Sequence, residues 1–258
     1  MTRALRLTPH GSEAIERTLA VERPIAIEVN GIGYAVMMAT PADLDAFAIG
    51  FMLTERLADV RNDVLDHDVV DTAQGIILRI TLAQHCADRI ADRVRHRTSD
   101  TGCGLCGIAS LENLTRPAPT APQATLRSAA VFAALADMRD HQPLNRATGA
   151  VHAAAYCNAD GTIVAAFEDV GRHNALDKLV GALARNGISA GTGFVLVTSR
   201  LSFEMVDKAL ISGVSALVGI SAATTMALDH ARAHGLTLIA LARDDAVLVL
   251  NDPHRVFA

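Results

Sequence analysis

Apolar and polar residues alternate near the start of the chain, and a helical pattern follows them. Residues 25–29 alternate, Asn30-Gly31 supplies a tight turn, and residues 34–38 return as a second strand. Thr40 is placed to cap a helix that has Pro41 at its first position. Apolar residues then recur three and four positions apart, at Leu44, Phe47, Ala48, Phe51 and Met52. This spacing predicts a helix with one buried face.

Two further apolar runs and a change in composition set the domain boundaries. The runs at residues 69–70 and 76–81 predict strands, so residues 1–85 are expected to form a small α+β domain. Residues 86–127 contain a basic cluster, then Ser, Asp and Gly, and then several prolines. Long segments of this kind inside compact proteins are usually functional or disordered. We therefore expect residues 86–127 to be a flexible linker.

After residue 127, predicted helices and strands alternate along the chain. Helices are expected at residues 128–141, 173–184, 203–211 and 222–234. Strands are expected at residues 150–156, 163–167, 194–198, 216–220, 236–241 and 247–250, the first two forming a hairpin. Strands interleaved with helices are typical of a mostly parallel sheet covered on both faces. Residues 128–258 are therefore predicted to be an α/β domain.

Composition and charge narrow the classes of function. The 258 residues include 23 basic and 28 acidic residues, which gives a formal charge of −5, and aromatic residues are scarce. A broad basic face or a stacking platform for nucleic acid is therefore disfavoured. No apolar run reaches the length of a membrane span, and the basic residues 1–10 lead into no apolar signal region. We expect a cytoplasmic protein with neither a nucleic-acid nor a membrane partner.

Two cysteines in the predicted linker carry the most distinctive chemistry. Cys103 and Cys106 stand in the run GCGLCG, where three glycines make the backbone pliable. Arg95 and Arg97 would favour the reactive thiolate if they approach it. A C-x-x-C pair also suits half of a zinc site, but no second pair follows it, so no structural zinc is expected. Two inert surface cysteines are a further alternative.

The flexible setting favours sulfur transfer over the redox alternative. A dithiol oxidoreductase of the thioredoxin type needs a strand before the first cysteine and a helix starting from it, and neither is evident here. A persulfide carrier needs one thiolate that accepts a sulfane sulfur and a partner cysteine that assists release by forming a disulfide. The pair Cys103 and Cys106 meets this need on a pliable segment. Cys86 and Cys157 are interpreted as small buried hydrophobic residues.

Four blocks of sequence, in order along the chain, resemble the formate dehydrogenase accessory sulfurtransferases, the FdhD/NarQ family. The blocks are TGCGLCG at residues 101–107, TGAVHAA at 148–154, EDVGRHNALDKL at 168–179 and SRLSFEM at 199–205. The run at residues 24–57 is similar too, so the resemblance covers nearly the whole chain. It implies a C-terminal three-layer α/β/α domain like that of cytidine deaminases, and it suggests a homodimer.

The resemblance also implies a function and its partners. A cysteine desulfurase would load sulfur onto Cys103 as a persulfide, with Cys106 as its helper. The protein would pass that sulfur to a molybdenum or tungsten bis(guanine dinucleotide) cofactor, bound as substrate, which formate dehydrogenase requires for activity. The family's cofactor-binding segment falls on Leu241, Ala242, Arg243, Asp244, Asp245 and Ala246. A noncatalytic chaperone that only binds the cofactor is the remaining alternative.

The likeness to deaminases raises zinc-dependent deamination as a rival. Such enzymes need a His or Cys ligand beside a Glu and then a P-C-x-x-C run that supplies two thiolates. The corresponding region offers residues 173–175 and 199–202, which contain neither the glutamate nor the thiolates. The sequence therefore disfavours this reaction.

Residues at predicted strand ends are candidates for holding the cofactor. Gly219 and Ser221 are expected where a strand ends and a helix begins, a place that favours phosphate, although Ser221 could also be an ordinary N-cap. Arg172 could grip a pyrophosphate, and His173 could donate or accept a proton near the metal. Arg200 and Ser202 flank the start of a helix after a buried strand, the usual ligand position in open α/β sheets.

The remaining charged groups have simpler interpretations. Asp169 is expected to cap the helix that follows it. Glu204 and Lys208, four residues apart, are expected to form a surface ion pair. His230 and His234 are interpreted as part of a solvated helix face, since no third metal ligand is in view.

Overall fold

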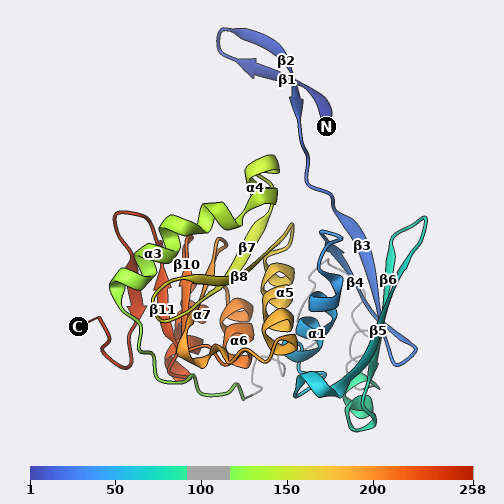
Figure 1. Cartoon of the computed structure of the whole chain (residues 1–258), viewed down its shortest axis with the longest axis vertical. Coiled ribbons are helices and arrows are strands. Elements are labelled where there is room, and N and C mark those ends of the chain that lie inside the picture. Colours follow the sequence, from blue (N-terminus) through green and yellow to red (C-terminus); the bar gives the residue numbers. More distant parts are fainter. Residues whose placement is uncertain (92–116, 258) are drawn as a thin grey trace.

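The computed structural model describes residues 1–91 and 117–257. Its first element is a hairpin that projects from the body of the molecule (Figure 1). The hairpin pairs β1 (Thr2–Thr8) with β2 (Gly11–Arg17) in antiparallel fashion, and nearly all of its residues are exposed. At its base, the Arg17 guanidinium donates a hydrogen bond to the carbonyl oxygen of Thr148 at 3.0 Å.

A four-stranded sheet follows, with the strand order β4-β3-β6-β5. Its strands are β3 (Arg23–Val29), β4 (Ile32–Ala39), β5 (Val64–Asp71) and β6 (Ile76–Leu82). The β3–β4 hairpin turns at Asn30, whose positive φ of 49° suits the tight turn predicted there. The α1 helix (Leu44–Thr54) packs on this sheet, and the apolar side chains of β3 and β6 form a core with it. The predicted strands and helix of this part are confirmed.

The predicted start of α1 is wrong by three residues. The helix begins at Leu44, after Asp43 in a left-handed conformation, and Thr40 does not cap it. Thr40 makes contacts with the other half of the chain instead. Its backbone N–H donates to Asp169 at 3.1 Å, and its hydroxyl accepts a hydrogen bond from the Val170 N–H at 3.2 Å. A long-range contact therefore overrides the local capping signal.

The central sheet has six strands in the order β12-β11-β10-β9-β7-β8. They are β7 (His152–Cys157), β8 (Ile163–Asp169), β9 (Phe194–Val197), β10 (Ala216–Gly219), β11 (Thr237–Ala240) and β12 (Leu248–Asn251). The pairs β9–β10 and β10–β11 are parallel, whereas β7–β8, β7–β9 and β11–β12 are antiparallel. The expectation of a mostly parallel sheet is therefore wrong, although each predicted strand exists.

Helices cover both faces of this sheet and give three layers (Figure 1). The helices are α3 (Ser128–Met138), α4 (Pro143–Thr148), α5 (Arg172–Arg185), α6 (Phe203–Ile211) and α7 (Thr225–Ala233). Residues of α5, α6 and α7 share one apolar core with the sheet, and those of α3 share a second core with its other face. Short 3-10 turns lie at η1 (Arg61–Asp63), η2 (Gln84–Cys86), η4 (Arg139–His141) and η5 (Ala190–Thr192). The mixed α/β class and its layered C-terminal half agree with the sequence-based expectation.

Parts of the predicted linker are packed into the two halves. Cys86 and Ile90 are buried in the core beneath the four-stranded sheet. Ala121, Ala124 and Leu126 are buried against the central sheet and its helices. The rest of the segment, residues 92–116, lies outside the described residues and includes Cys103 and Cys106. Within the described parts of the chain, no helix is long and apolar enough to cross a membrane.

Two glycines let α1 and α5 cross at close range. A Cβ atom built on Gly181 would overlap the carbonyl oxygen of Ala46, and one built on Gly50 would overlap the carbonyl oxygen of Asp177. We expect Gly181→Ala to lower the free energy of unfolding by about 3 kcal/mol, because backbone atoms cannot make room for the added methyl group. Urea unfolding monitored by circular dichroism measures this change.

Gly33→Ala is the matched control for that substitution. Gly33 also lies in a regular element, but an added Cβ atom there meets nothing within 4 Å. Its free energy of unfolding should stay the same or rise slightly, since alanine restricts the unfolded chain more than glycine does. If Gly181→Ala and Gly33→Ala had the same free energy of unfolding, α1 and α5 would not cross as closely as described.

Candidate functional site

The carboxyl ends of the three parallel strands bring several predicted site residues to one edge of the sheet. The segment after β9 is joined to the segment after β10, because Leu201 N–H donates to Ala222 O at 3.0 Å. The segment after β11 joins the same edge, because Leu241 N–H donates to Ser221 O at 3.0 Å and Ala242 N–H donates to Gly219 O at 3.1 Å. Such an edge is the usual ligand position in open α/β sheets.

Two of the predicted phosphate contacts are not supported by the local geometry. Ser221 does not open a helix: Thr224 is the N-cap of α7, and its hydroxyl accepts a hydrogen bond from Ala227 N–H at 3.3 Å. Gly219 lies against the Leu201 side chain, which an added Cβ atom would approach to 2.7 Å. The lack of a side chain at Gly219 therefore serves core packing rather than the approach of a ligand.

The predicted cofactor segment, residues 241–246, lies on the same edge. Leu241 has a positive φ of 48° and an exposed side chain. The Arg243 guanidinium donates to the carbonyl oxygens of Ile220 and Ala242, so it folds back over the end of β10. Residues 243–246 are exposed. At the surface beside the strand ends, this segment therefore exposes the apolar side chain of Leu241 and the guanidinium of Arg243.

A cluster of ionisable side chains lies where α5 and α6 begin. His173 in the first turn of α5 places its Nε2 atom 3.0 Å from an Oε2 atom of Glu204 on α6. The hydrogen bond from His173 is the main reason that the pKa of Glu204 is lowered. His152 on β7 is near enough for the charges of Arg172 and His173 to lower its pKa, in addition to burial, which is the larger cause.

Besides the His173 Nε2 atom that faces Glu204, two donors in this cluster are buried without a hydrogen-bond partner among the described residues. They are the Nε atom of Arg172, the first residue of α5, and the hydroxyl of Ser202, the N-cap of α6. A buried donor left unpaired costs about 1–3 kcal/mol, so such groups in a folded protein call for an explanation. A guanidinium and a hydroxyl at two helix N-termini are suited to an anionic ligand.

A buried ion pair fixes the turn that presents Arg172. One oxygen of Asp169 accepts hydrogen bonds from Gly171 N–H at 2.8 Å and from the Asn174 amide at 3.0 Å. Its other oxygen lies 2.6 Å from the Lys178 ammonium, and both side chains of this pair are fully buried. Asp169 is therefore not the helix cap expected from the sequence, since Gly171 is the N-cap of α5. Through its hydrogen bonds to Gly171 and Asn174, Asp169 fixes the start of α5 from inside the protein.

A second buried cation joins α1, α5 and α6. The Lys208 ammonium donates to both oxygens of Asp177 at 2.9 and 3.0 Å, and to the Thr54 hydroxyl at 2.9 Å. It also lies 3.3 Å from Glu55. The expected surface pair between Lys208 and Glu204 is therefore wrong. Charged residues usually lie at the surface, and nothing in the local pattern indicates that this lysine is buried.

The two helix histidines are also placed differently from the expectation. The His230 side chain is only 9% exposed, and its Nε2 atom lies 3.1 Å from Asp207. Its ring packs 4.4 Å from the ring of Phe203 and 4.7 Å from that of His234. These histidines form part of the packing between α6 and α7 rather than a solvated face.

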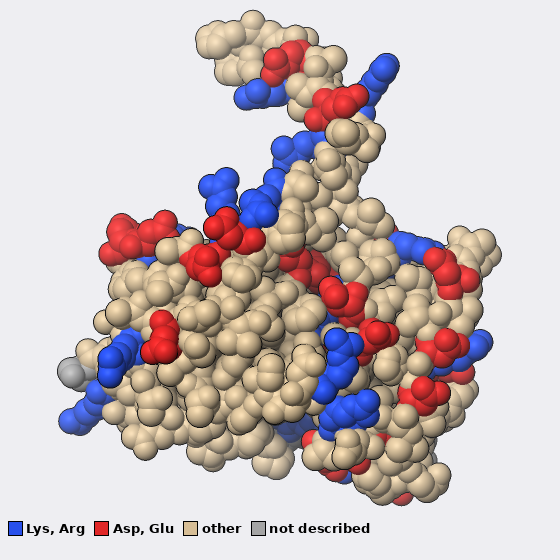
Figure 2. All heavy atoms as spheres, viewed as in Figure 1, with Lys and Arg blue, Asp and Glu red and all other residues tan. Residues whose placement is uncertain are grey.

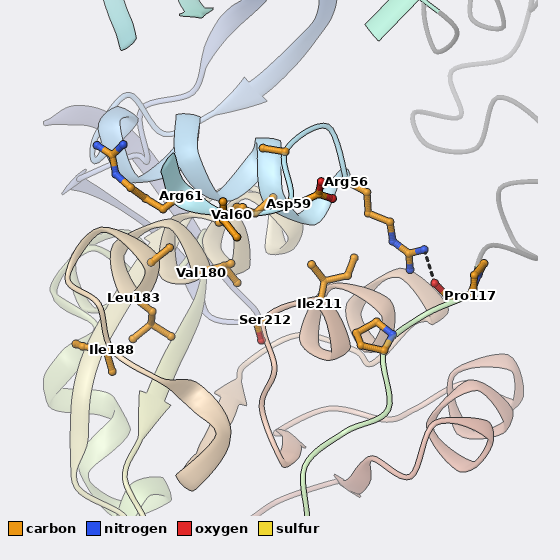
Figure 3. A pocket seen from close by; sticks show the side chains of 14 residues that line it. Arg56, Asp59, Val60, Arg61, Pro117, Val180, Leu183, Ile188, Ile211 and Ser212 are labelled. Carbon is orange, nitrogen blue, oxygen red and sulfur yellow. Dashed lines mark hydrogen bonds between the residues drawn. The ribbon is translucent and has the colours of Figure 1, made fainter. Parts of the chain in front are cut away.

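A cavity of about 490 Å³ lies at the other end of α5 from this cluster. Apolar side chains such as Leu53, Val180 and Ile188 line it, and Figure 3 shows Arg56 beside Pro117 at its edge. The Arg56 guanidinium donates to the carbonyl oxygen of Pro117 at 3.0 Å and to Asp207 at 2.7 Å. These bonds anchor the chain where the described structure resumes after residue 116.

Figure 2 shows how charged side chains are distributed on one face of the molecule. On that face, basic side chains are interspersed with acidic ones, and no continuous basic area is formed.

Comparisons with known proteins connect this arrangement to one group. A family model described as the FdhD/NarQ family matches residues 20–257. A protein of Variovorax paradoxus named sulfur carrier protein FdhD is 45% identical over 239 residues, which cover 92% of this chain and 86% of that protein. A protein of the same name from Agrobacterium fabrum is 43% identical over 243 residues, covering 93% and 90%.

A solved structure agrees with these matches. It is the crystal structure of a protein assigned as a formate dehydrogenase accessory protein from Desulfotalea psychrophila. It superposes with a TM-score of 0.78 and 25% sequence identity, over 99% of this chain and 97% of that one.

Proposed function

This chain belongs to the FdhD/NarQ family, and from that premise we propose that it is a sulfur carrier in the maturation of formate dehydrogenase. Cys103 receives sulfur from a cysteine desulfurase as a persulfide. The acceptor is a molybdenum or tungsten bis(guanine dinucleotide) cofactor, which the protein binds as substrate. The names of the relatives support the coarser part of this proposal, a sulfur carrier connected with formate dehydrogenase.

The loading step is an exchange between thiolate and persulfide. The Cys103 thiolate attacks the terminal sulfur of the desulfurase persulfide, the S–S bond of the donor breaks, and the donor cysteine leaves as a thiolate. One new S–S bond forms on Cys103, so no external oxidant or reductant is consumed. Glycines on both sides of Cys103 suit a residue that must approach a second protein.

The release step uses the second cysteine. The Cys106 thiolate attacks the inner sulfur of the persulfide, a Cys103–Cys106 disulfide forms, and the terminal sulfur leaves as hydrosulfide with the bonding electron pair. The released hydrosulfide would supply the sulfido ligand that the metal of the bound cofactor requires. A thiol reductant then returns the disulfide to two thiols. In this scheme, Cys103 carries the sulfur and Cys106 completes its release.

The observation that carries the proposal for cofactor binding is the pair of unpartnered donors at the candidate site. Arg172 Nε and Ser202 Oγ are donors without a partner among the described residues, and the phosphates of a guanine dinucleotide would supply acceptors for them. Arg200 lies on the segment between β9 and α6, beside Ser202. His173, paired with Glu204, lies in the same cluster. The exposed Leu241 offers an apolar contact for a guanine base.

Binding of guanosine diphosphate tests this placement. We expect Arg172→Gln to raise the dissociation constant for guanosine diphosphate about 10- to 100-fold. This change corresponds to the loss of one charge-assisted hydrogen bond worth about 1.5–3 kcal/mol. Isothermal titration calorimetry on the full chain measures it.

Arg185→Gln is the control, because Arg185 is a partly exposed arginine at the other end of the same helix. It should bind guanosine diphosphate like the unchanged chain. If both variants keep the original dissociation constant and circular dichroism shows that both are folded, Arg172 does not contact the nucleotide.

A further inference from the structure

Three side chains with metal-binding atoms lie together in the N-terminal half, outside the candidate site. Asp63 ends η1, and His85 and Cys86 lie in η2, just after β6. One ligand atom from each of the three residues lies within 4.8 Å of the other two. Neither the sulfur-transfer proposal nor the resemblance assigns these residues a role.

Hydrogen bonds hold the carboxylate of this group in one orientation. One oxygen of Asp63 accepts the N–H groups of Asp59 at 2.8 Å and of Val60 at 3.1 Å. The other oxygen lies 3.2 Å from His85 Nε2. The two turns are joined by Ala83 N–H, which donates to the carbonyl oxygen of Asp63 at 2.8 Å. The carboxylate and the imidazole are thus positioned before any ion binds, as in sites whose ligands are fixed by outer hydrogen bonds.

Burial gives the group an inner and an outer side. Cys86 is fully buried, the Asp63 side chain is 9% exposed, and the His85 side chain is 59% exposed. A cation held here would have the thiolate and the carboxylate on its protein side and the imidazole toward solvent. Three protein ligands and access to solvent leave a fourth position for water, the arrangement of open zinc sites.

The ligand types select the class of cation. Thiolate and imidazole favour zinc and similar borderline metals, whereas calcium and magnesium prefer sites made of oxygen atoms. Burial and the charge of Asp63 raise the pKa of the Cys86 thiol. A divalent cation would reverse the local charge and bind the thiolate, so binding would release a proton.

We propose that Asp63, His85 and Cys86 bind one zinc-type divalent ion. The ion would join the turn at residues 59–63 to the turn at residues 83–86. Asp63, His85 and Cys86 do not follow the paired C-x-x-C spacing that marks structural zinc sites in a sequence, so the sequence alone does not indicate this group. The inference is independent of the sulfur-transfer proposal, since Cys103 and Cys106 take no part in it.

Cobalt(II) is the probe for this site. The test uses the full chain carrying Cys103→Ser and Cys106→Ser, so that these two thiols cannot bind the probe. We expect one equivalent of cobalt to bind and to produce a thiolate-to-cobalt charge-transfer band in the near ultraviolet. Adding Cys86→Ser should abolish the band. Adding His85→Ala should weaken cobalt binding at least about tenfold, because one of three protein ligands is lost.

His67→Ala is the matched control. His67 also lies 3.2 Å from a carboxylate, that of Asp45, but it is not part of the three-residue group. It should leave the band and the affinity unchanged. The proposal is overturned if no charge-transfer band forms, or if the band persists in the Cys86→Ser chain, which would assign it to Cys157. If Cys86→Ser fails to fold, His85→Ala decides, because its exposed side chain contributes little to the core.

Discussion

Cys103→Ser should abolish sulfur loading completely, whereas Cys106→Ser should still be loaded and should fail to release the sulfur. The first substitution removes the nucleophile of the loading step, and the second removes the thiolate that forms the disulfide. Intact mass spectrometry after incubation with a cysteine desulfurase and cysteine would show one added sulfur atom on the unchanged chain and on Cys106→Ser. A sulfur atom added to Cys103→Ser would exclude Cys103 as the carrier.

The same two variants separate the alternatives. A dithiol oxidoreductase would reduce the disulfides of insulin and would lose that activity with either substitution. A noncatalytic chaperone would support formate dehydrogenase maturation equally well with both cysteines replaced. Guanosine diphosphate should bind to Cys103→Ser as it does to the unchanged chain, because the candidate site at the strand ends contains neither cysteine. That result would show that loss of loading is not loss of folding.

Lys208→Met should lower the free energy of unfolding by about 3–5 kcal/mol, since it leaves the buried Asp177 carboxylate without its cation. Both oxygens of Asp177 accept hydrogen bonds from Lys208, and Thr54 and Glu55 contact the same ammonium. Urea unfolding measures the loss. The exposed pair of Arg6 and Glu13 provides the control, because Arg6→Met should change stability by less than about 1 kcal/mol.

The stability of the Lys208→Met variant should depend on pH in one direction. Burial is the main reason that the pKa of Asp177 is raised, and Lys208 opposes that effect. Without Lys208, folded Asp177 holds its proton at pH values where the unfolded chain, with an ordinary pKa of about 4, has lost it. The folded state then binds more protons, so the free energy of unfolding falls as pH rises above about 4.

A double substitution distinguishes this explanation from a simple packing defect. Asp177→Asn combined with Lys208→Met should recover part of the stability and remove the added pH dependence, because no buried carboxylate remains. If Lys208→Met instead shows the same pH dependence as the unchanged chain, Asp177 is not the group that responds.

The sequence pattern predicted most strands and helices but not the way in which they pair. Periodicity reports which face of an element is buried, and it contains no information on the neighbouring strand. The β7–β8 hairpin was therefore found, whereas the antiparallel placement of β7 beside β9 was not. The β1–β2 hairpin was missed because it buries neither face, so its sequence has no apolar alternation of the usual kind.

Local signals also failed where a distant residue competes for the same group. Thr40 has the hydroxyl group of a typical N-cap, but that hydroxyl accepts a hydrogen bond from Val170, after β8. Likewise, Thr224 rather than Ser221 is the N-cap of α7. Arg172 and Ser202 are candidates from the sequence because both stand at helix starts after strands, and the structure places them at the starts of α5 and α6. Lys178 and Lys208 were not found as buried residues, because only the folded chain brings their acidic partners around them.

The close crossing of α1 and α5 makes the N-terminal sheet and the central sheet one thermodynamic unit. Leu53 contacts the apolar cores of both halves. Across this junction, the Lys178 ammonium donates to the carbonyl oxygen of Thr40, and the Lys208 ammonium lies 3.3 Å from Glu55. Separating the halves would expose two ammonium–carboxylate networks together with a glycine-lined helix face. The chain should therefore denature in a single calorimetric transition, with no intermediate in which one half is folded alone.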